Sequence, residues 1–98
     1  MILCVFIHET AEAEINEAAD FYDIQAPGLG TVFLDEVQHI IESVMRHPQA
    51  AMPLRGNLRK KMMAKFPYSL VYSVRPNEIR VLAIAHHKRR PFYWRGRR

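Results

Sequence analysis

The side chains best suited to proton transfer gather near the end of the 98-residue chain. His86 and His87 follow an apolar stretch, and Tyr93 comes shortly after them. Histidine titrates near neutral pH and can serve as an acid or a base. Cleavage of RNA by its own 2′-hydroxyl needs a base, an acid and cations that stabilise charge on the phosphate. His86, His87 and Tyr93 are therefore the candidate catalytic groups if the chain cleaves RNA without a metal.

Cations that could bind an anion lie in two places in the second half of the sequence. One group is spaced along an expected strand, and the other follows the two histidines and includes an aromatic ring that could stack on a base. The alternatives are a solvated surface for the lysines and packing on the core for the aromatic ring. The candidate target- or phosphate-binding residues are Arg59, Lys61, Lys65, Lys88, Arg89, Arg90 and Trp94.

Charge is divided unequally along the chain. Residues 1–50 contain nine acids and one base, Arg46, and so carry a net charge of −8 with histidine neutral. Residues 51–98 contain thirteen bases and one acid, Glu78, and so carry +12. The basic half favours a polyanion or an acidic protein surface as the partner, and the alternative is a solvated basic face without a partner.

Composition places the chain among globular proteins. Apolar residues make up 49% and charged residues 24%, a composition that argues against wholesale disorder. The apolar run at residues 1–7 is too short to span a bilayer and lacks the features of a secretory signal. One cysteine, Cys4, excludes an intrachain disulfide and is expected to be a small buried apolar residue. We expect a cytoplasmic protein with one domain over residues 1–98, no membrane association, no metal and no cofactor.

Hydrophobic spacing predicts the elements of the first half. An apolar run over residues 3–7 predicts a short buried strand. Thr10 is the expected N-cap of a first helix, whose apolar stripe continues to Tyr22. A second helix carries its stripe over residues 33–44 and ends before Pro48. The short Pro-Gly-containing loop between the two helices predicts an antiparallel helical hairpin.

The second half has the character of β-structure. Residues 48–57 contain two prolines and a Gly-Asn pair, so a loop is expected there. Strands are predicted over residues 58–66, 68–75 and 78–85, with a turn at Pro76-Asn77 joining the last two. The clearest alternation of apolar and polar residues is in the second of these strands.

This order predicts an α+β fold, β-α-α-β-β-β, with a small antiparallel-rich sheet, a helical hairpin on one face and a basic C-terminal tail. Arg59, Lys61 and Lys65 alternate along their strand and should share one face. Because cations rarely stay buried without partners, we expect that face to be open and continuous with the tail. The expected core residues are Ile15, Ala18, Phe33, Val37, Ile40, Val44, Leu70, Tyr72, Val81 and Ala83.

Several short segments, taken in order, carry a resemblance to a known family. They are Ala18–Tyr22, Pro27–Gly30, Phe33–Val37, His47-Pro48, Lys65–Tyr72, Val81–His86 and Arg89–Trp94. With these segments the chain resembles the RelE/ParE superfamily of toxins from bacterial toxin–antitoxin pairs, also labelled plasmid stabilisation proteins. The resemblance is closer to the ParE side and covers nearly the whole chain.

The resemblance implies a growth-arresting toxin that a cognate antitoxin neutralises in a hetero-oligomer. ParE-like toxins inhibit DNA gyrase by binding, and we expect this activity because no complete acid–base set is recognisable after the last strand. The alternative is a RelE-like, metal-independent messenger RNA endoribonuclease that acts on the ribosome. A second alternative is a non-toxic, basic RNA-binding module.

Overall fold

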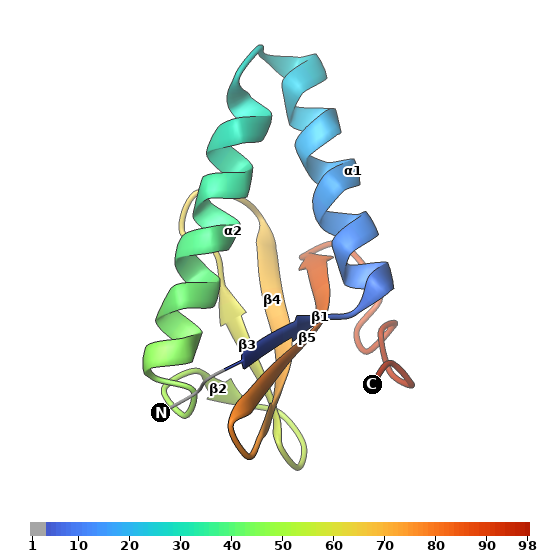
Figure 1. The fold of residues 1–98 in the computed structure, drawn as a ribbon. Helices are drawn as coiled ribbons and strands as arrows, with labels where there is room; N and C mark the ends of the chain where they lie inside the picture. Colours follow the sequence, from blue (N-terminus) through green and yellow to red (C-terminus); the bar gives the residue numbers. More distant parts are fainter. Residues whose placement is uncertain (1–3) are drawn as a thin grey trace.

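A computed structural model describes residues 4–98, in which two helices cover one face of a five-stranded sheet (Figure 1). The two helices form a hairpin, and the last strand leads into the C-terminal segment. The elements are β1 (Cys4–Ile7), α1 (Glu9–Gln25), α2 (Leu29–Arg46), β2 (Met52–Pro53), β3 (Leu58–Met62), β4 (Tyr68–Arg75) and β5 (Glu78–His86). The α+β fold and the order of its main elements confirm the prediction from the sequence.

The sheet is mixed, with strand order β1-β5-β4-β3-β2. β1 runs parallel to β5, and every other neighbouring pair is antiparallel. β1 pairs only with the first part of β5, from Glu78 to Val81. Among residues 4–98, the rest of β5, from Leu82 onwards, therefore has no neighbouring strand on that side.

Two predicted boundaries in the second half were wrong. The expected loop over residues 48–57 contains β2, whose Met52 and Pro53 pair with Lys60 and Arg59. Proline is tolerated there because β2 is an edge strand and its missing N–H is not needed by a further neighbour. The strand expected over residues 58–66 ends at Met62, after which the chain turns towards β4.

The start of the chain also differs from the prediction. His8, and not Thr10, is the N-cap of α1: its Nδ1 accepts a hydrogen bond from the Thr10 N–H at 3.1 Å. Thr10 already lies within the first helical turn. Cys4 is exposed because β1 is an edge strand, so the prediction of a buried thiol was wrong. Leu3, predicted to begin this strand, lies outside the described residues.

Apolar side chains from both helices and the sheet form the core between them. All ten predicted core residues are buried, nine of them in this core and Ala83 on the opposite face of the sheet. Phe33 is fully buried, and its ring packs against Tyr22, Phe66 and Tyr68 with centroid separations of 5.5, 5.1 and 5.3 Å. The fully buried Tyr72 donates its hydroxyl proton to the Pro48 carbonyl at 2.9 Å, which satisfies its polar group.

The hairpin depends on a close approach at Gly30, in the first turn of α2. Its N–H donates to the Asp23 carboxylate of α1 at 2.7 Å. A Cβ on residue 30 would lie only 2.7 Å from Asp23 Cγ and would also overlap the Ala19 carbonyl oxygen. Glycine therefore allows the two helices to meet at this point.

We expect Gly30→Ala to destabilise the protein by about 1–3 kcal/mol, because the added methyl group must push the helices apart. Urea unfolding followed by circular dichroism measures this loss. Thr31→Ala, at the exposed neighbouring position of the same helix, is the matched control and should change stability by about 0.5 kcal/mol or less. Equal stability of the two variants would contradict the close approach.

Candidate functional site

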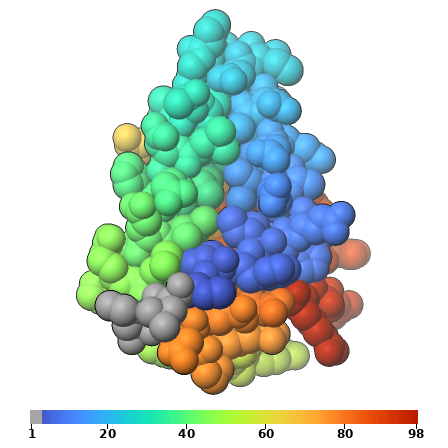
Figure 2. All heavy atoms as spheres, in the orientation of Figure 1, coloured from blue at the N-terminus to red at the C-terminus, as the bar shows by residue number. Residues whose placement is uncertain are grey.

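The face of the sheet opposite the helices is partly covered by the C-terminal segment. Trp94 is only 6% exposed and packs with Val71 and Ala83 of the sheet. The segment ends beside the first turns of α1, where it is visible in red in Figure 2. The alternative considered for Trp94, packing on the core, is therefore the one found.

The structure reverses the predicted face for two of the strand cations. Arg59 lies opposite Tyr72 and Lys61 opposite Leu70, and both partners belong to the core under the helices. Arg59 is accommodated because its guanidinium donates to the carbonyls of Gln49 and Ala51, at 2.9 and 2.7 Å. The prediction that these cations lie on the open face was wrong, because backbone carbonyls compensate the charge of Arg59.

Lys61 and Lys65 belong to a different place on the molecule from the tail. They line an open groove of about 600 Å³ between α2 and the end of β3. The Glu36 carboxylate of α2 accepts the Lys65 backbone N–H at 3.1 and 3.2 Å and fixes this turn to the helix. The predicted continuous surface of strand lysines and tail is therefore not formed.

The two neighbouring histidines point to opposite faces of the sheet. His86 lies opposite Tyr68 on the helix side, with ring centroids 5.0 Å apart, and its Nδ1 accepts the Lys88 N–H at 3.0 Å. His87 lies on the tail side, with its Nε2 3.0 Å from the Oγ of the buried Ser69. Both residues border one hollow beside the tail, but no hydrogen bond joins their rings in the described part of the chain.

Tyr93 is held by a carboxylate of the first helix. Its hydroxyl donates to Glu14 Oε2 at 2.8 Å. Burial, followed by this hydrogen bond and the negative charge of Glu14, raises the pKa of Tyr93 to about 12, although the nearby Arg89 and Arg97 oppose the shift. The hydroxyl is therefore protonated near neutral pH, and its proton is already donated to Glu14 in a hydrogen bond.

This raised pKa predicts a loss of stability in alkali. Below pH 10 the phenol is neutral in both folded and unfolded chains, and its contribution is complete. Between pH 10 and about 12 the unfolded chain releases the proton while the folded chain keeps it, so this contribution is lost. Tyr93→Phe should therefore show a shallower fall of stability over this range. Titration of the phenolate absorbance in the wild-type protein and in Tyr93→Phe should assign the highest tyrosine pKa to Tyr93. An unshifted pKa for Tyr93 would contradict its hydrogen bond to Glu14.

The tail presents its remaining cations around two shallow hollows. The first, of about 140 Å³, is lined by seven polar, basic or aromatic residues among others: Lys60, His86, His87, Arg89, Arg90, Tyr93 and Trp94. The second, of about 230 Å³, is also lined by Trp94, together with Arg95 and Arg97 of the tail. Lys88, Arg89 and Arg90 are exposed. The result is a basic surface with apolar patches, suited to an acidic protein face or a nucleic acid.

Two residues of this region were not predicted from the sequence. Lys60 faces the tail because it alternates with Arg59, so the correct face of β3 would have identified it. Glu14 looked like one of several acids on α1 and carried no signal for its contact with Tyr93, which is 79 residues further along the chain.

Neither helix within residues 4–98 is long and apolar enough to cross a membrane. In the same part of the chain, no three His, Cys, Asp or Glu side chains are grouped so that they could hold a metal ion.

Comparison with known proteins gives a family and a fold. The profile of a family described as the ParE toxin of the type II toxin–antitoxin system parDE matches residues 5–91. A solved structure titled as the chromosomal ParDE TA system from P. aeruginosa is similar, with a TM-score of 0.76 and 17% identity. The match covers 87% of this chain and 96% of that one. No curated protein sequence matches the chain.

Proposed function

The chain belongs to the ParE toxin family of type II toxin–antitoxin systems, and we propose that it arrests bacterial growth by binding DNA gyrase through its basic tail. The observation that carries this proposal is the exposed group Lys88, Arg89 and Arg90, of which the two arginines line the hollow at Trp94. An arginine-rich patch with buried aromatic support is typical of a protein-binding surface.

The contacts that the proton-transfer candidates already make favour binding over catalysis. His86, His87 and Tyr93 line one hollow, but the His86 ring packs on Tyr68, His87 lies beside Ser69 and the Tyr93 hydroxyl donates to Glu14. Cations alone stabilise charge but cannot move the 2′-hydroxyl proton. In this proposal the tail recognises its target and carries out no reaction.

RNA cleavage is the second candidate, and one observation favours it. His86, His87 and Tyr93 line the same hollow as Lys60 and Arg90, so the candidate acid and base groups adjoin two cations suited to a phosphate. In this alternative, His87→Ala would abolish messenger RNA cleavage, whereas gyrase inhibition by binding should tolerate that change.

We propose that the partner is an antitoxin whose toxin-binding segment carries acidic residues and apolar anchors. Acidic side chains would complement the +12 charge of residues 51–98. Together the two proteins would form a hetero-oligomer in the cytoplasm, where gyrase also acts, and the antitoxin would keep the tail from its target.

Induction of the chain alone in bacteria tests the biological role. Growth should stop, and co-expression of the neighbouring reading frame should restore it. Normal growth at high expression of folded protein, with no rescuing frame, would contradict the proposal and favour a non-toxic basic RNA-binding module.

A further inference from the structure

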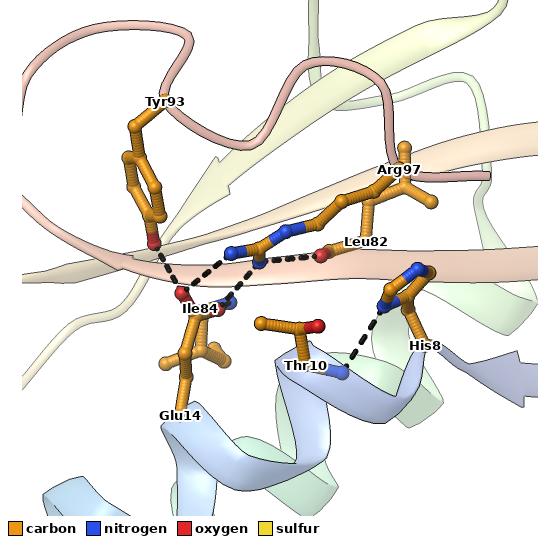
Figure 3. A network of polar contacts seen from close by, with 7 residues as sticks. All are labelled: His8, Thr10, Glu14, Leu82, Ile84, Tyr93 and Arg97. Carbon is orange, nitrogen blue, oxygen red and sulfur yellow. Dashed lines mark hydrogen bonds and ion pairs between the residues drawn. The ribbon is translucent and has the colours of Figure 1, made fainter.

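One carboxylate joins the first helix to the C-terminal segment (Figure 3). Glu14 Oε2 accepts hydrogen bonds from the Tyr93 hydroxyl at 2.8 Å and from Arg97 Nη2 at 3.2 Å. Glu14 Oε1 accepts from Arg97 Nη1 at 3.0 Å and from the Ile84 N–H at 3.3 Å. The Glu14 side chain is only 14% exposed, so these contacts are largely shielded from water.

The same contacts cover the part of β5 that β1 leaves without a neighbour. Arg97 Nη1 also donates to the Leu82 carbonyl at 3.0 Å, and Glu14 accepts the Ile84 N–H. Two side chains thus pair with backbone groups that a further strand would otherwise use. These contacts therefore attach the tail both to the sheet and to α1, in addition to the packing of Trp94 on the sheet.

This attachment extends to a cation of the proposed target-binding surface. The Arg89 guanidinium lies 3.9 Å from the centroid of the Tyr93 ring, and the Arg97 guanidinium lies 5.2 Å from it. Because Glu14 fixes the Tyr93 hydroxyl, it also fixes the ring on which Arg89 packs. Arg89 itself does not touch Glu14 by any hydrogen bond among residues 4–98.

Glu14 differs from the other acidic residues in the ion pair that it forms. Within the described part of the chain there are two ion pairs, and the one between Glu78 and Arg80 is local to β5. The pair of Glu14 with Arg97 is the one that links the acidic half to the basic half. A shielded, multiply hydrogen-bonded pair holds its geometry better than an exposed one.

We infer that Glu14 is a positioning residue, which holds the basic tail against α1 and β5 so that Arg89 meets its target in one fixed arrangement. This inference rests on the proposed function, because the position of Arg89 matters only if a target binds to it. A surface ordered before binding loses less conformational entropy on binding than a mobile one, so its affinity is higher.

Trp94 makes this inference measurable, since it is the one tryptophan of the sequence and lies in the attached tail. Glu14→Ala should raise the quenching of Trp94 fluorescence by acrylamide while the circular dichroism spectrum stays that of the folded chain. The matched control is Glu17→Ala, because Glu17 is exposed on the same helix. Glu14→Gln, which keeps the shape of the side chain and removes its charge, is a second variant and should give a smaller change in the same direction.

The second readout is activity, which a purely structural role would leave unchanged. Glu14→Ala should weaken gyrase inhibition about tenfold or more, although Arg89 and Arg90 are intact. Unchanged quenching in Glu14→Ala would overturn the inference. Increased quenching with no more loss of inhibition than in Glu17→Ala would overturn it too.

Failure of the proposed function would be recognised separately in the wild-type chain. If the wild-type chain leaves gyrase active but still arrests growth, the proposed target is wrong, and growth arrest replaces inhibition as the activity readout for the same variants. If the wild-type chain shows neither activity, the positioning role falls together with the function that it serves.

Discussion

Replacement of Arg89 and Arg90 by alanine is expected to remove most of the growth arrest while the fold stays intact. Both side chains are exposed, so the core does not depend on them. Truncating an arginine at the centre of an interface costs about 2 kcal/mol or more, which weakens binding about 30-fold for each such residue. Colony formation under induction measures the effect in cells, and the concentration needed for gyrase inhibition measures it with purified protein.

Arg46→Ala is the matched control for this prediction. Arg46 is an exposed base in the last turn of α2, on a different element from the tail. It should arrest growth as the wild-type chain does. An equal, salt-dependent weakening of target binding in Arg89→Ala, Arg90→Ala and Arg46→Ala would contradict a defined binding surface. It would indicate nonspecific binding to a polyanion.

Phe33→Ala is expected to have the largest effect on stability, a loss of about 3–5 kcal/mol. The ring is fully buried and contacts three other aromatic rings, so its removal leaves a cavity between α2 and the sheet. Since small domains are stable by about 5–15 kcal/mol, this loss is a large share of the total. Urea unfolding should show a much lower midpoint for the variant.

The neighbouring Leu34 provides the control for that measurement. Its side chain is 41% exposed on the same helix, so Leu34→Ala should cost about 1 kcal/mol or less. Losses of similar size in the two variants would mean that Phe33 is not the centre of the core.

The fold was predictable where a periodic apolar pattern was long enough. The stripe over residues 33–44 identified α2, and the alternation from Tyr68 to Arg75 identified β4 and the face that it turns towards the helices. β2 was missed because a strand of two residues, one of them proline, has no alternation to detect. The first N-cap was misplaced because His8 supplies the acceptor that Thr10 was expected to supply.

The candidate site was predictable only where it is local in the sequence. The cluster at residues 88–90 is visible as a run of bases. The face of the sheet on which Arg59 lies was predicted wrongly. The prediction assumed that a cation on the helix side would lack hydrogen-bond partners, whereas the carbonyls of Gln49 and Ala51 accept hydrogen bonds from Arg59. The role of Glu14 could not be predicted from the sequence. It arises only in the fold, where Glu14 forms an ion pair with Arg97, 83 positions further along the chain.

The most direct test of the central claim is a supercoiling assay with purified gyrase and the purified chain, run beside a messenger RNA cleavage assay with and without ribosomes. We predict inhibition of supercoiling that the Arg89 and Arg90 variants lose, with intact RNA under every condition. Specific RNA cleavage that disappears in His87→Ala, with gyrase fully active, would contradict the account.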